Sequence, residues 1–264
     1  MTSALRIGVI GGGGWLGGAI VRSILKAKLT SPQRLTLSSR RDPPPDFPGV
    51  VWTRDNQDLV DHSDVVIVSV RPADWPALTI VAGDKLVLSV MAGIRLAQLS
   101  EQFKAERVVR ALPNAAAEVG KSYTPWVASA GVNDLDRSVV RSIFDACGIQ
   151  DEVANEADID YLTGLSGSGP AFPALLAAVM IEDAVAHGIA RHIARRSATA
   201  TMVGAGYLFE QIGEEPAETV DRFVAYGGTT AAAIEAMRSR GFDAAVSAGL
   251  AAALKKSVGL GHGS

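Results

Sequence analysis

A glycine-rich turn near the start of the chain constrains the fold most strongly. The stretch IGVIGGGGWLGG places four consecutive glycines between a short β-branched run and an amphipathic segment. Gly12, Gly14 and Gly17 satisfy the pattern G-x-G-x-x-G, in which the glycines allow a tight turn, close approach to a pyrophosphate, and close packing of helix on strand. The helix that follows directs free N–H groups at the phosphates. The pattern therefore predicts a dinucleotide-binding site.

The run of four glycines leaves the register of this turn open. Gly11 and Gly13 could take the first two roles instead, which would put Leu16 where a small residue is preferred. In either register Trp15 and Leu16 lie in the predicted cofactor loop, because they open the helix that follows the glycines.

The first half of the chain alternates apolar runs with amphipathic segments. The runs that we expect to be strands are, in order, RIGVIG, RLTLSSR, DVVIVSV, KLVLSVMAG and RVVRALPN. Continuous apolar runs are typical of parallel strands that are covered on both faces. Residues 1–157 are therefore predicted to form an α/β domain of the Rossmann type, with a doubly wound parallel sheet.

The second half, residues 158–264, is predicted to form an all-α domain that binds substrate and dimerises. It is rich in alanine, which has the highest helix propensity. The segment 171–181 is apolar on every face, which predicts a helix buried all round. A helical domain of about 100 residues buries such a helix more easily with a partner subunit, so we expect a homodimer, or a higher oligomer, through these helices. The alternative is the central helix of a monomeric bundle.

Charge and cysteine content exclude several classes of function. The net charge of −3 provides no basic patch for nucleic acid and no polybasic membrane anchor. The apolar run 170–181 is shorter than the about 20 residues that cross a bilayer, and the N-terminus lacks the longer apolar core of a signal peptide.

Cys147 is the only cysteine, which excludes an intrachain disulfide. We therefore expect a cytoplasmic protein, and the sequence has no metal-ligand spacing that would predict a metal.

The end of the second predicted strand indicates which nucleotide binds. An NAD-specific domain has an acidic residue there for the ribose 2′-hydroxyl, whereas this chain has Ser38, Ser39, Arg40 and Arg41. Hydroxyl and guanidinium groups bind a 2′-phosphate through charge-assisted hydrogen bonds. We therefore predict NADPH, with NADH left open. Arg40 is assigned to the site, Arg41 is left undecided, and Asp42 is taken as part of the loop.

At these motifs the chain resembles the pyrroline-5-carboxylate reductase family nearly end to end. The matching stretches are the glycine turn, TRDN (53–56), VSVRP (68–72), SVMAG (89–93), RALPN (110–114), LTGLSGSGPAF (162–172) and GGTT (227–230). Five positions, in three stretches, depart from the family pattern. Arg71 stands where lysine is common, Ala115-Ala116 where Thr-Pro is usual, and Ala225-Tyr226 where Ser-Pro is usual.

The resemblance implies roles for particular residues. Asn56 would contact the adenosine ribose, and two strand ends would lie beside the nicotinamide. The residues of these strand ends are Val70, Arg71, Pro72, Ala92 and Gly93.

The resemblance also implies a substrate site. Gly227, Gly228, Thr229 and Thr230 would hold the substrate carboxylate, with the Thr230 hydroxyl near the ring nitrogen. Ser166, Ser168 and Gly169 would line the same pocket, with Thr230 and Ser168 as the catalytic candidates. From the residues themselves, we also expect Ser166 or Ser168 to cap the following helix, with Pro170 in its first turn.

The predicted activity is NADPH-dependent reduction of 1-pyrroline-5-carboxylate to L-proline. Hydride addition to a protonated imine gives a neutral amine, so no side chain has to donate a proton during the transfer. The related β-hydroxyacid dehydrogenases need a lysine on the long second-domain helix, and this chain has no lysine between Lys121 and Lys255. Two alternatives remain open, which are a same-fold reductase of another cyclic imino acid and a non-catalytic nucleotide-binding protein.

Overall fold

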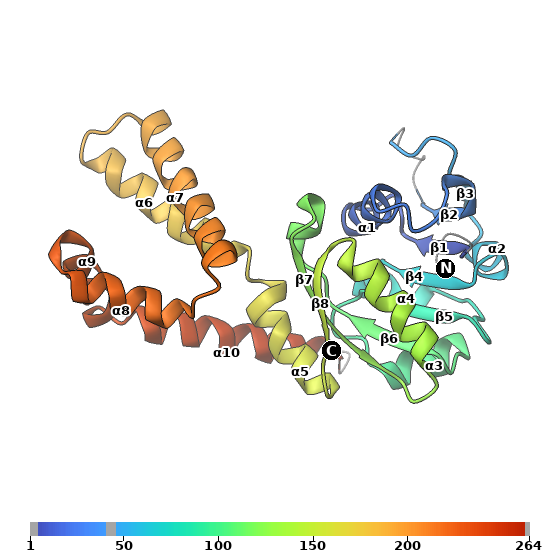
Figure 1. The fold of residues 1–264 in the computed structure, drawn as a ribbon. Helices are drawn as coiled ribbons and strands as arrows, with labels where there is room; N and C mark the ends of the chain where they lie inside the picture. The colour runs from blue at the N-terminus through green and yellow to red at the C-terminus, as the bar shows by residue number, and fades with distance from the viewer. Residues whose placement is uncertain (1–4, 41–45, 262–264) are drawn as a thin grey trace. The chain divides into compact units, whose positions relative to one another are not determined.

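The computed structural model describes residues 5–40 and 46–261 (Figure 1). Two predicted positions, Arg41 and Asp42, lie outside the described residues. The chain folds into two compact units. We call residues 1–168 together with 252–264 the sheet unit, and residues 169–251 the helical unit. The predicted domain boundary after residue 157 stays a prediction.

The sheet unit contains an eight-stranded sheet with the order β3-β2-β1-β4-β5-β6-β7-β8. All neighbouring strands are parallel except β6 and β7, which are antiparallel. The strands are β1 (Ile7–Ile10), β2 (Leu35–Ser38), β3 (Val51–Thr53), β4 (Val65–Val68), β5 (Leu86–Ser89), β6 (Val108–Ala111), β7 (Ser122–Ala128) and β8 (Gly148–Glu152). Strands β3, β7 and β8 were not predicted from the sequence; β3 has three residues, and β8 is mostly exposed and lacks an apolar run.

Helices cover both faces of this sheet, which explains why β1, β4, β5 and β6 are buried along their whole length. Helices α1 (Trp15–Lys26) and α4 (Asp134–Asp145) pack into one apolar core. Helices α2 (Asn56–Asp61) and α3 (Leu96–Phe103) pack into the other. This is the doubly wound arrangement that the apolar runs predict.

The rest of the sheet unit follows β8. Helix α5 (Glu156–Leu162) continues into a π-helical turn, Thr163–Gly167. The C-terminal part of α10 (Phe242–Gly261) returns to the sheet unit, where the Ser257 Oγ lies 3.5 Å from Asp160 Oδ1. Asp160 also belongs to a buried ionic cluster, since its two oxygens lie 2.7 Å from Arg110 Nη2 and 2.7 Å from Arg95 Nη2.

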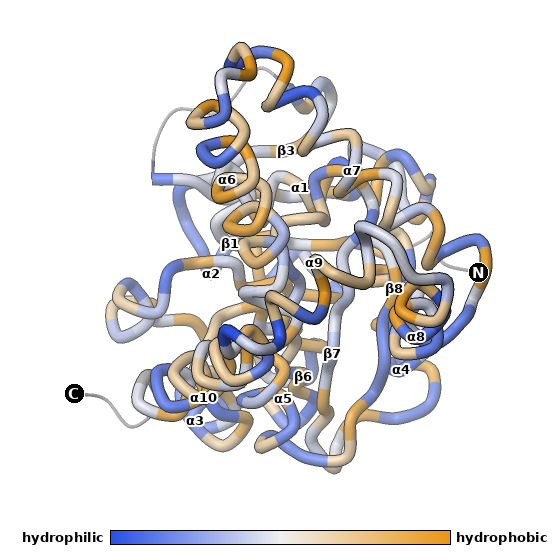
Figure 2. Tube along the Cα trace, turned by 90° about the vertical axis from the view of Figure 1, so that its left-hand side faces the viewer, coloured by the Kyte–Doolittle hydropathy of each residue, from blue (hydrophilic) through white to orange (hydrophobic). Residues whose placement is uncertain are grey.

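The helical unit contains α6 (Ala171–Ala186), α7 (Arg191–Ile212), α8 (Pro216–Tyr226), α9 (Gly228–Ser239) and the first part of α10. Apolar residues follow α6 along its length (Figure 2), yet none of its residues is buried in the single chain. The alternative of a central helix in a monomeric bundle is therefore wrong. The predicted burial of α6 is not met within one chain either.

Candidate functional site

The glycine turn joins β1 to α1 in the geometry that a dinucleotide requires. Gly11 has a φ of +83°, which is a left-handed conformation that favours glycine. A Cβ on Gly17 would lie 2.5 Å from the carbonyl oxygen of Gly11, and a Cβ on Gly12 would lie 3.1 Å from Leu37. Helix and turn therefore approach each other too closely for a side chain at 17. Gly17 therefore takes the close-packing role of the register Gly12, Gly14 and Gly17, whereas the left-handed conformation of the turn lies at Gly11.

The open side of this turn fits a pyrophosphate. Gly14 and Trp15 are exposed, and they begin a 12-residue helix whose first N–H groups have no acceptor within the helix. Leu16, next to them, packs on the apolar core of the sheet unit. The residues present thus fit a dinucleotide, with backbone donors facing outward and apolar anchors facing inward.

The predicted adenosine-binding residues come together at the end of β2. Ser38 is buried, and its hydroxyl donates a hydrogen bond of 2.7 Å to Asn56 Oδ1 in the first turn of α2. Asp55 caps that helix by accepting from the N–H groups of Gln57 and Asp58. The half-buried Ser39 follows, and then the exposed Arg40.

Arg40 and Arg71, which the sequence assigned to opposite ends of the cofactor, contact one carboxylate. Arg71 follows β4 and immediately precedes the 3-10 helix Pro72–Ala77, which contains Asp74. The guanidinium groups of Arg40 and Arg71 both lie 2.9 Å from Asp74 Oδ2. These contacts hold the pKa of the Asp74 carboxyl below its usual value, mainly through the hydrogen bond from Arg71. Asp74 was not singled out in the sequence, because a 3-10 helix of six residues is too short to show a periodic pattern.

The remaining cofactor candidates lie at the carboxyl ends of neighbouring parallel strands. Val70 is half-buried just beyond β4, and Pro72 begins the 3-10 helix. Ala92 and Gly93 follow β5, where Gly93 has a φ of +81°. Ligands of open α/β sheets bind at this edge, next to the strand where the order reverses. That reversal lies between β1 and β4 in this sheet.

The segment Ser166–Ser168 is attached to the end of β6 through Asn114. The Asn114 side chain donates a hydrogen bond of 3.0 Å to the Ser166 carbonyl and accepts one of 2.9 Å from the Ala116 N–H. A Cβ on Gly167 would lie 3.0 Å from Leu112. Asn114 belongs to the RALPN stretch, but its partner is 52 positions away, and no sequence pattern indicates such a contact.

The expected helix cap at Ser166 or Ser168 is wrong. The two hydroxyl groups donate backward instead, Ser166 to the Leu162 carbonyl and Ser168 to the Thr163 carbonyl, at 2.9 and 3.2 Å. They stabilise the π-helical turn, and α6 starts after Pro170 without a side-chain cap. A π-helical turn leaves carbonyls that a nearby hydroxyl can satisfy, and local bonds of this kind compete with capping.

The GGTT stretch forms the start of α9 in the helical unit. Gly227 and Gly228 have φ values of 80° and 76°, and Gly228, Thr229 and Thr230 form the first turn. The N–H groups of a first turn have no acceptor within the helix, and the helix dipole places partial positive charge there. This turn can therefore bind a carboxylate. Gly169 begins the same unit, whereas Ser166 and Ser168 end the sheet unit.

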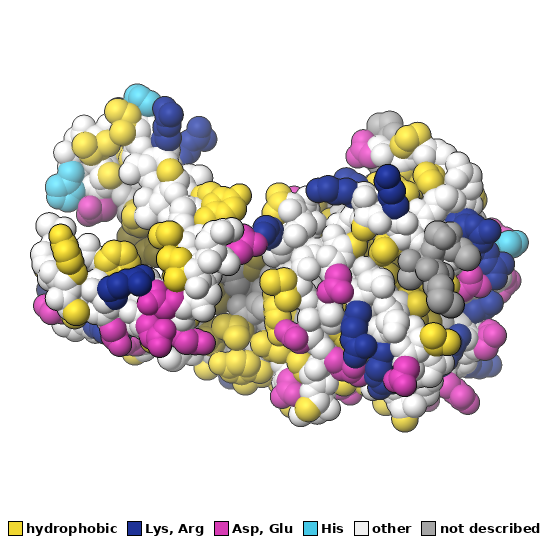
Figure 3. All heavy atoms as spheres, in the orientation of Figure 1, with side chains coloured by type: hydrophobic (Ala, Val, Ile, Leu, Met, Phe, Trp, Pro, Cys, Tyr) yellow, Lys and Arg dark blue, Asp and Glu magenta, His cyan; other side chains and the backbone are white. Residues whose placement is uncertain are grey.

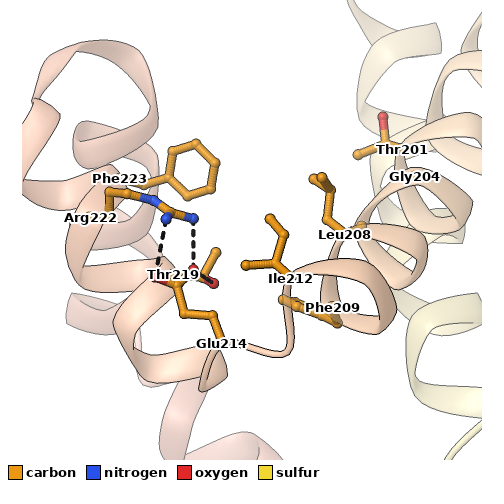
Figure 4. Close-up of a pocket in the computed structure, with 10 residues that line it drawn as sticks. Thr201, Gly204, Leu208, Phe209, Ile212, Glu214, Thr219, Arg222 and Phe223 are labelled. Carbon is orange, nitrogen blue, oxygen red and sulfur yellow. Dashed lines mark hydrogen bonds and ion pairs between the residues drawn. The ribbon is translucent and has the colours of Figure 1, made fainter.

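A separate groove of about 500 Å³ lies between α7 and α8 (Figure 4). Leu208, Ile212 and Phe223 point into it, while Arg222 is paired with Glu214 at 2.8 Å. The lining is mostly apolar and contains none of the residues predicted to bind cofactor or substrate. In the described part of the chain, no group of three or more His, Cys, Asp or Glu side chains is arranged to hold a metal ion.

Comparison with known proteins places the chain in a family. A relative from Synechocystis sp., named pyrroline-5-carboxylate reductase, is 31% identical over 98% of this chain and 99% of its own length. The chain belongs to the pyrroline-5-carboxylate reductase family. A relative of the same name from Arabidopsis thaliana is also 31% identical, over 97% of this chain and 95% of its own length.

Family models and solved structures agree with this assignment. Residues 156–260 match the model for pyrroline-5-carboxylate reductase dimerisation, and residues 6–93 match an NADP oxidoreductase model described as coenzyme F420-dependent. A pyrroline-5-carboxylate reductase structure from Coxiella burnetii superposes with a TM-score of 0.88, at 26% identity over 97% of this chain and 98% of the other. The Plasmodium falciparum pyrroline carboxylate reductase with NADP bound gives 0.85, at 25% identity over 99% and 100%. The predicted family and fold class are confirmed.

Proposed function

We propose that this protein reduces 1-pyrroline-5-carboxylate to L-proline with NADPH. The observation that carries the proposal is the end-to-end match to a pyrroline-5-carboxylate reductase, because it spans both the glycine turn and the GGTT turn. The structural neighbour with NADP bound and the NADP oxidoreductase model support the predicted cofactor. The activity and cofactor predicted from the sequence agree with all of these comparisons.

The residues of the sheet unit divide the binding of NADPH between them. The turn Gly11–Gly17 receives the pyrophosphate, Asn56 the adenosine ribose, and Ser38, Ser39 and Arg40 the 2′-phosphate. The cofactor supplies the hydride when it is bound. Two strand ends border the nicotinamide through Val70, Pro72, Ala92 and Gly93.

The helical unit holds the substrate in this proposal. The first turn of α9 binds the carboxylate of the imine, and the Thr230 hydroxyl accepts or donates a hydrogen bond at the ring nitrogen. The resemblance also assigns Ser166, Ser168 and Gly169 to the substrate, and within the sheet unit Asn114 holds the Ser166 carbonyl in place. The amine product forms without a proton from a side chain, so the protein contributes chiefly by orientation, which accounts for about 7–11 kcal/mol of a barrier in favourable cases.

A coupled assay tests this function. Purified protein is mixed with NADPH and the imine, and the loss of reduced cofactor is compared with the proline formed. We expect one proline per NADPH oxidised, and a much slower reaction for Thr230→Val, which keeps the shape of the side chain but removes its hydroxyl. Absence of turnover, or equal turnover in Thr230→Val, would contradict the proposal.

A second candidate is the reduction of a different cyclic imino acid. Two pairs of positions motivate it. Ala115 and Ala116 follow Asn114 in a 3-10 helix, and Ala225 and Tyr226 precede the GGTT turn, where Tyr226 is 91% exposed. A panel of cyclic imines that differ in ring size and heteroatom distinguishes the two candidates. Selectivity for the five-membered ring, together with inhibition by proline, supports the first.

The second subunit is proposed to be another copy of this chain, bound through the C-terminal helices. Leu175 and Val179 on α6 are 68% and 61% exposed in the single chain, and hydrophobic side chains gather on the helical unit (Figure 3). The groove between α7 and α8 adds further uncovered apolar surface. Exposed apolar area of this extent indicates an interaction surface, and the dimerisation model matches these same residues.

A membrane is the alternative environment for an exposed apolar helix. The stretch Glu156–Ala186 is long and apolar enough to cross a membrane by length and composition, and 6% of its most apolar window is buried. The match to the dimerisation model over this stretch favours a protein partner instead. A location in the cytoplasm stays a prediction from the sequence.

A further inference from the structure

The carboxylate of Asp74 lies between two guanidinium groups that come from different loops. Arg40 donates to both oxygens, from Nη1 at 3.1 Å and from Nη2 at 2.9 Å. Arg71 also donates to both oxygens, from Nε at 2.9 Å and from Nη2 at 3.4 Å. Two arginines therefore converge on a single anion.

The position of this cluster relates it to the nucleotide. Arg40 follows β2 and Arg71 follows β4, and these two strands flank β1, which leads into the glycine turn. Both arginines thus extend from the carboxyl edge of the sheet on either side of the strand that carries the pyrophosphate turn. Arg40 already belongs to the proposed 2′-phosphate site.

Exposure leaves the arginines able to bind a second anion. Their side chains are 78% and 77% exposed, whereas that of Asp74 is 21% exposed. Each guanidinium has five N–H donors, and the contacts with Asp74 use two of them. A backbone hydrogen bond of 2.8 Å from the Asp74 N–H to the Arg71 carbonyl fixes the aspartate in its turn.

We propose that Arg40 and Arg71 together bind the 2′-phosphate of the cofactor, and that Asp74 competes with this phosphate for them and so limits the preference for NADPH over NADH. The inference rests on the cofactor assigned under the proposed function. A phosphate monoester carries about −1.5 to −2 charges at neutral pH. Two arginines alone would offer it two positive charges, and Asp74 reduces that net charge to one.

Removing the charge of Asp74 tests the competition directly. Calorimetry compares the wild type with Asp74→Asn for adenosine 2′,5′-bisphosphate and for AMP, which lacks the 2′-phosphate. We expect the bisphosphate to bind about three- to tenfold more tightly to Asp74→Asn, the range for removing one charge a few ångströms from a phosphate at a solvated surface. The affinity for AMP should stay within about twofold of the wild-type value. AMP has no 2′-phosphate, and the repulsion by Asp74 acts mainly on that group.

Two further variants complete the test. Arg71→Met should weaken the bisphosphate and leave AMP unchanged, which separates a phosphate ligand from a residue beside the nicotinamide. Asp84→Asn changes the net charge equally but lies just before β5, at the amino end of that strand, so its two affinities should match the wild type. The ratio of kcat/KM for NADPH and NADH should rise in Asp74→Asn and fall in Arg71→Met.

The outcomes separate this inference from the proposed function. An unchanged or lower ratio of bisphosphate to AMP affinity in Asp74→Asn, with imine reduction intact, overturns the role of Asp74 alone. The same result would show that the cluster is an ordinary surface ion pair of little consequence. A wild type that neither binds the bisphosphate nor reduces the imine overturns both proposals.

Discussion

In the sheet unit apolar side chains fill the space on both faces of the sheet, whereas in residues 169–251 only Ala194, Ala198 and Ala231 are buried. The sheet unit also buries an ionic cluster around Arg110 and Asp160, while the ion pairs of the helical unit lie at its surface. The first region therefore contains its own core. The second region has helices of ordinary length but buries almost no side chains within one chain. This difference is what the proposed dimer explains, because a second copy would cover the exposed apolar side chains.

The largest expected effect follows from placing a charge on the uncovered face of α6. Leu175→Asp would bury an unpaired carboxylate in the proposed interface, which costs about 3–5 kcal/mol. We expect this variant to lose its oligomeric state, as measured by light scattering, and to lose imine reduction with it.

Leu135→Asp is the matched control for that variant. Leu135 lies on α4 of the sheet unit and is 76% exposed, compared with 68% for Leu175. The control should assemble and react like the wild type. If both variants lose their oligomeric state, or both keep it, then the exposed apolar residues of α6 do not form the proposed interface.

A methyl group in the glycine turn tests the packing of the sheet unit. Gly17→Ala puts a Cβ 2.5 Å from the Gly11 carbonyl oxygen, so the turn has to shift. Overpacking of this kind costs about 1–3 kcal/mol, and we expect NADPH to bind about tenfold more weakly in a titration.

The adjacent glycine provides the control in the same helix. A Cβ on Gly18 would lie 3.5 Å from both the Gly12 carbonyl oxygen and Arg22, which are ordinary contacts. Gly18→Ala should keep its NADPH affinity within about twofold, since alanine is also the better helix former. Equal losses in both variants would mean that close packing at Gly17 is not what the turn requires.

Breaking the buried ionic cluster should destabilise the sheet unit. The Arg110 side chain is 1% exposed, and Arg110→Met would leave the buried Asp160 with Arg95 as its remaining cation. Loss of one partner in a buried pair costs about 3–5 kcal/mol of the free energy of unfolding. We expect a loss at the lower end of this range, because Arg95 still pairs with Asp160. Urea denaturation measures the change.

The surface pair of Arg191 and Glu182 serves as the reference in the helical unit. These side chains are 61% and 63% exposed, so Arg191→Met should leave the unfolding midpoint unchanged within error. A midpoint shift as large as that of Arg110→Met would contradict the contrast between the two units.

The smallest effect concerns the single cysteine. Cys147 is buried, and burial raises the pKa of its thiol above the ordinary value. Its contribution to the free energy of unfolding is full below the unfolded-state pKa and is lost as pH rises through the folded-state pKa. Cys147→Ala should remove this alkaline decline in urea titrations, and the native thiol should react with a disulfide reagent far more slowly than the unfolded one.

Much of the sheet unit could be predicted because its signals are local. The glycine turn, the apolar runs and the serine-arginine stretch after β2 each consist of neighbouring residues. Such local patterns can be recognised in the sequence without knowing the fold. The partly exposed strand β8 gave no such signal. The apolar character of α6 on all its faces was also visible in the sequence, whereas its burial by a partner stays a prediction.

The contacts that were missed join residues far apart in the chain. Asp74 contacts Arg40, which is 34 positions away in the sequence, and Asn114 contacts Ser166, which is 52 positions away. In both contacts one residue follows a strand at the carboxyl edge of the sheet, Arg40 after β2 and Asn114 after β6, and its position depends on the assembled strands. The expected cap at Ser166 or Ser168 failed for a similar reason, because a π-helical turn offered those hydroxyl groups nearer carbonyls.

The contrast between the two units is tested most directly by the molar mass of the native protein, measured by light scattering on a fraction whose imine reduction is assayed at the same concentration. The active species should have at least twice the chain mass of 27.5 kDa, because in the proposed dimer a second copy covers α6. A fully active species of 27.5 kDa would contradict the account.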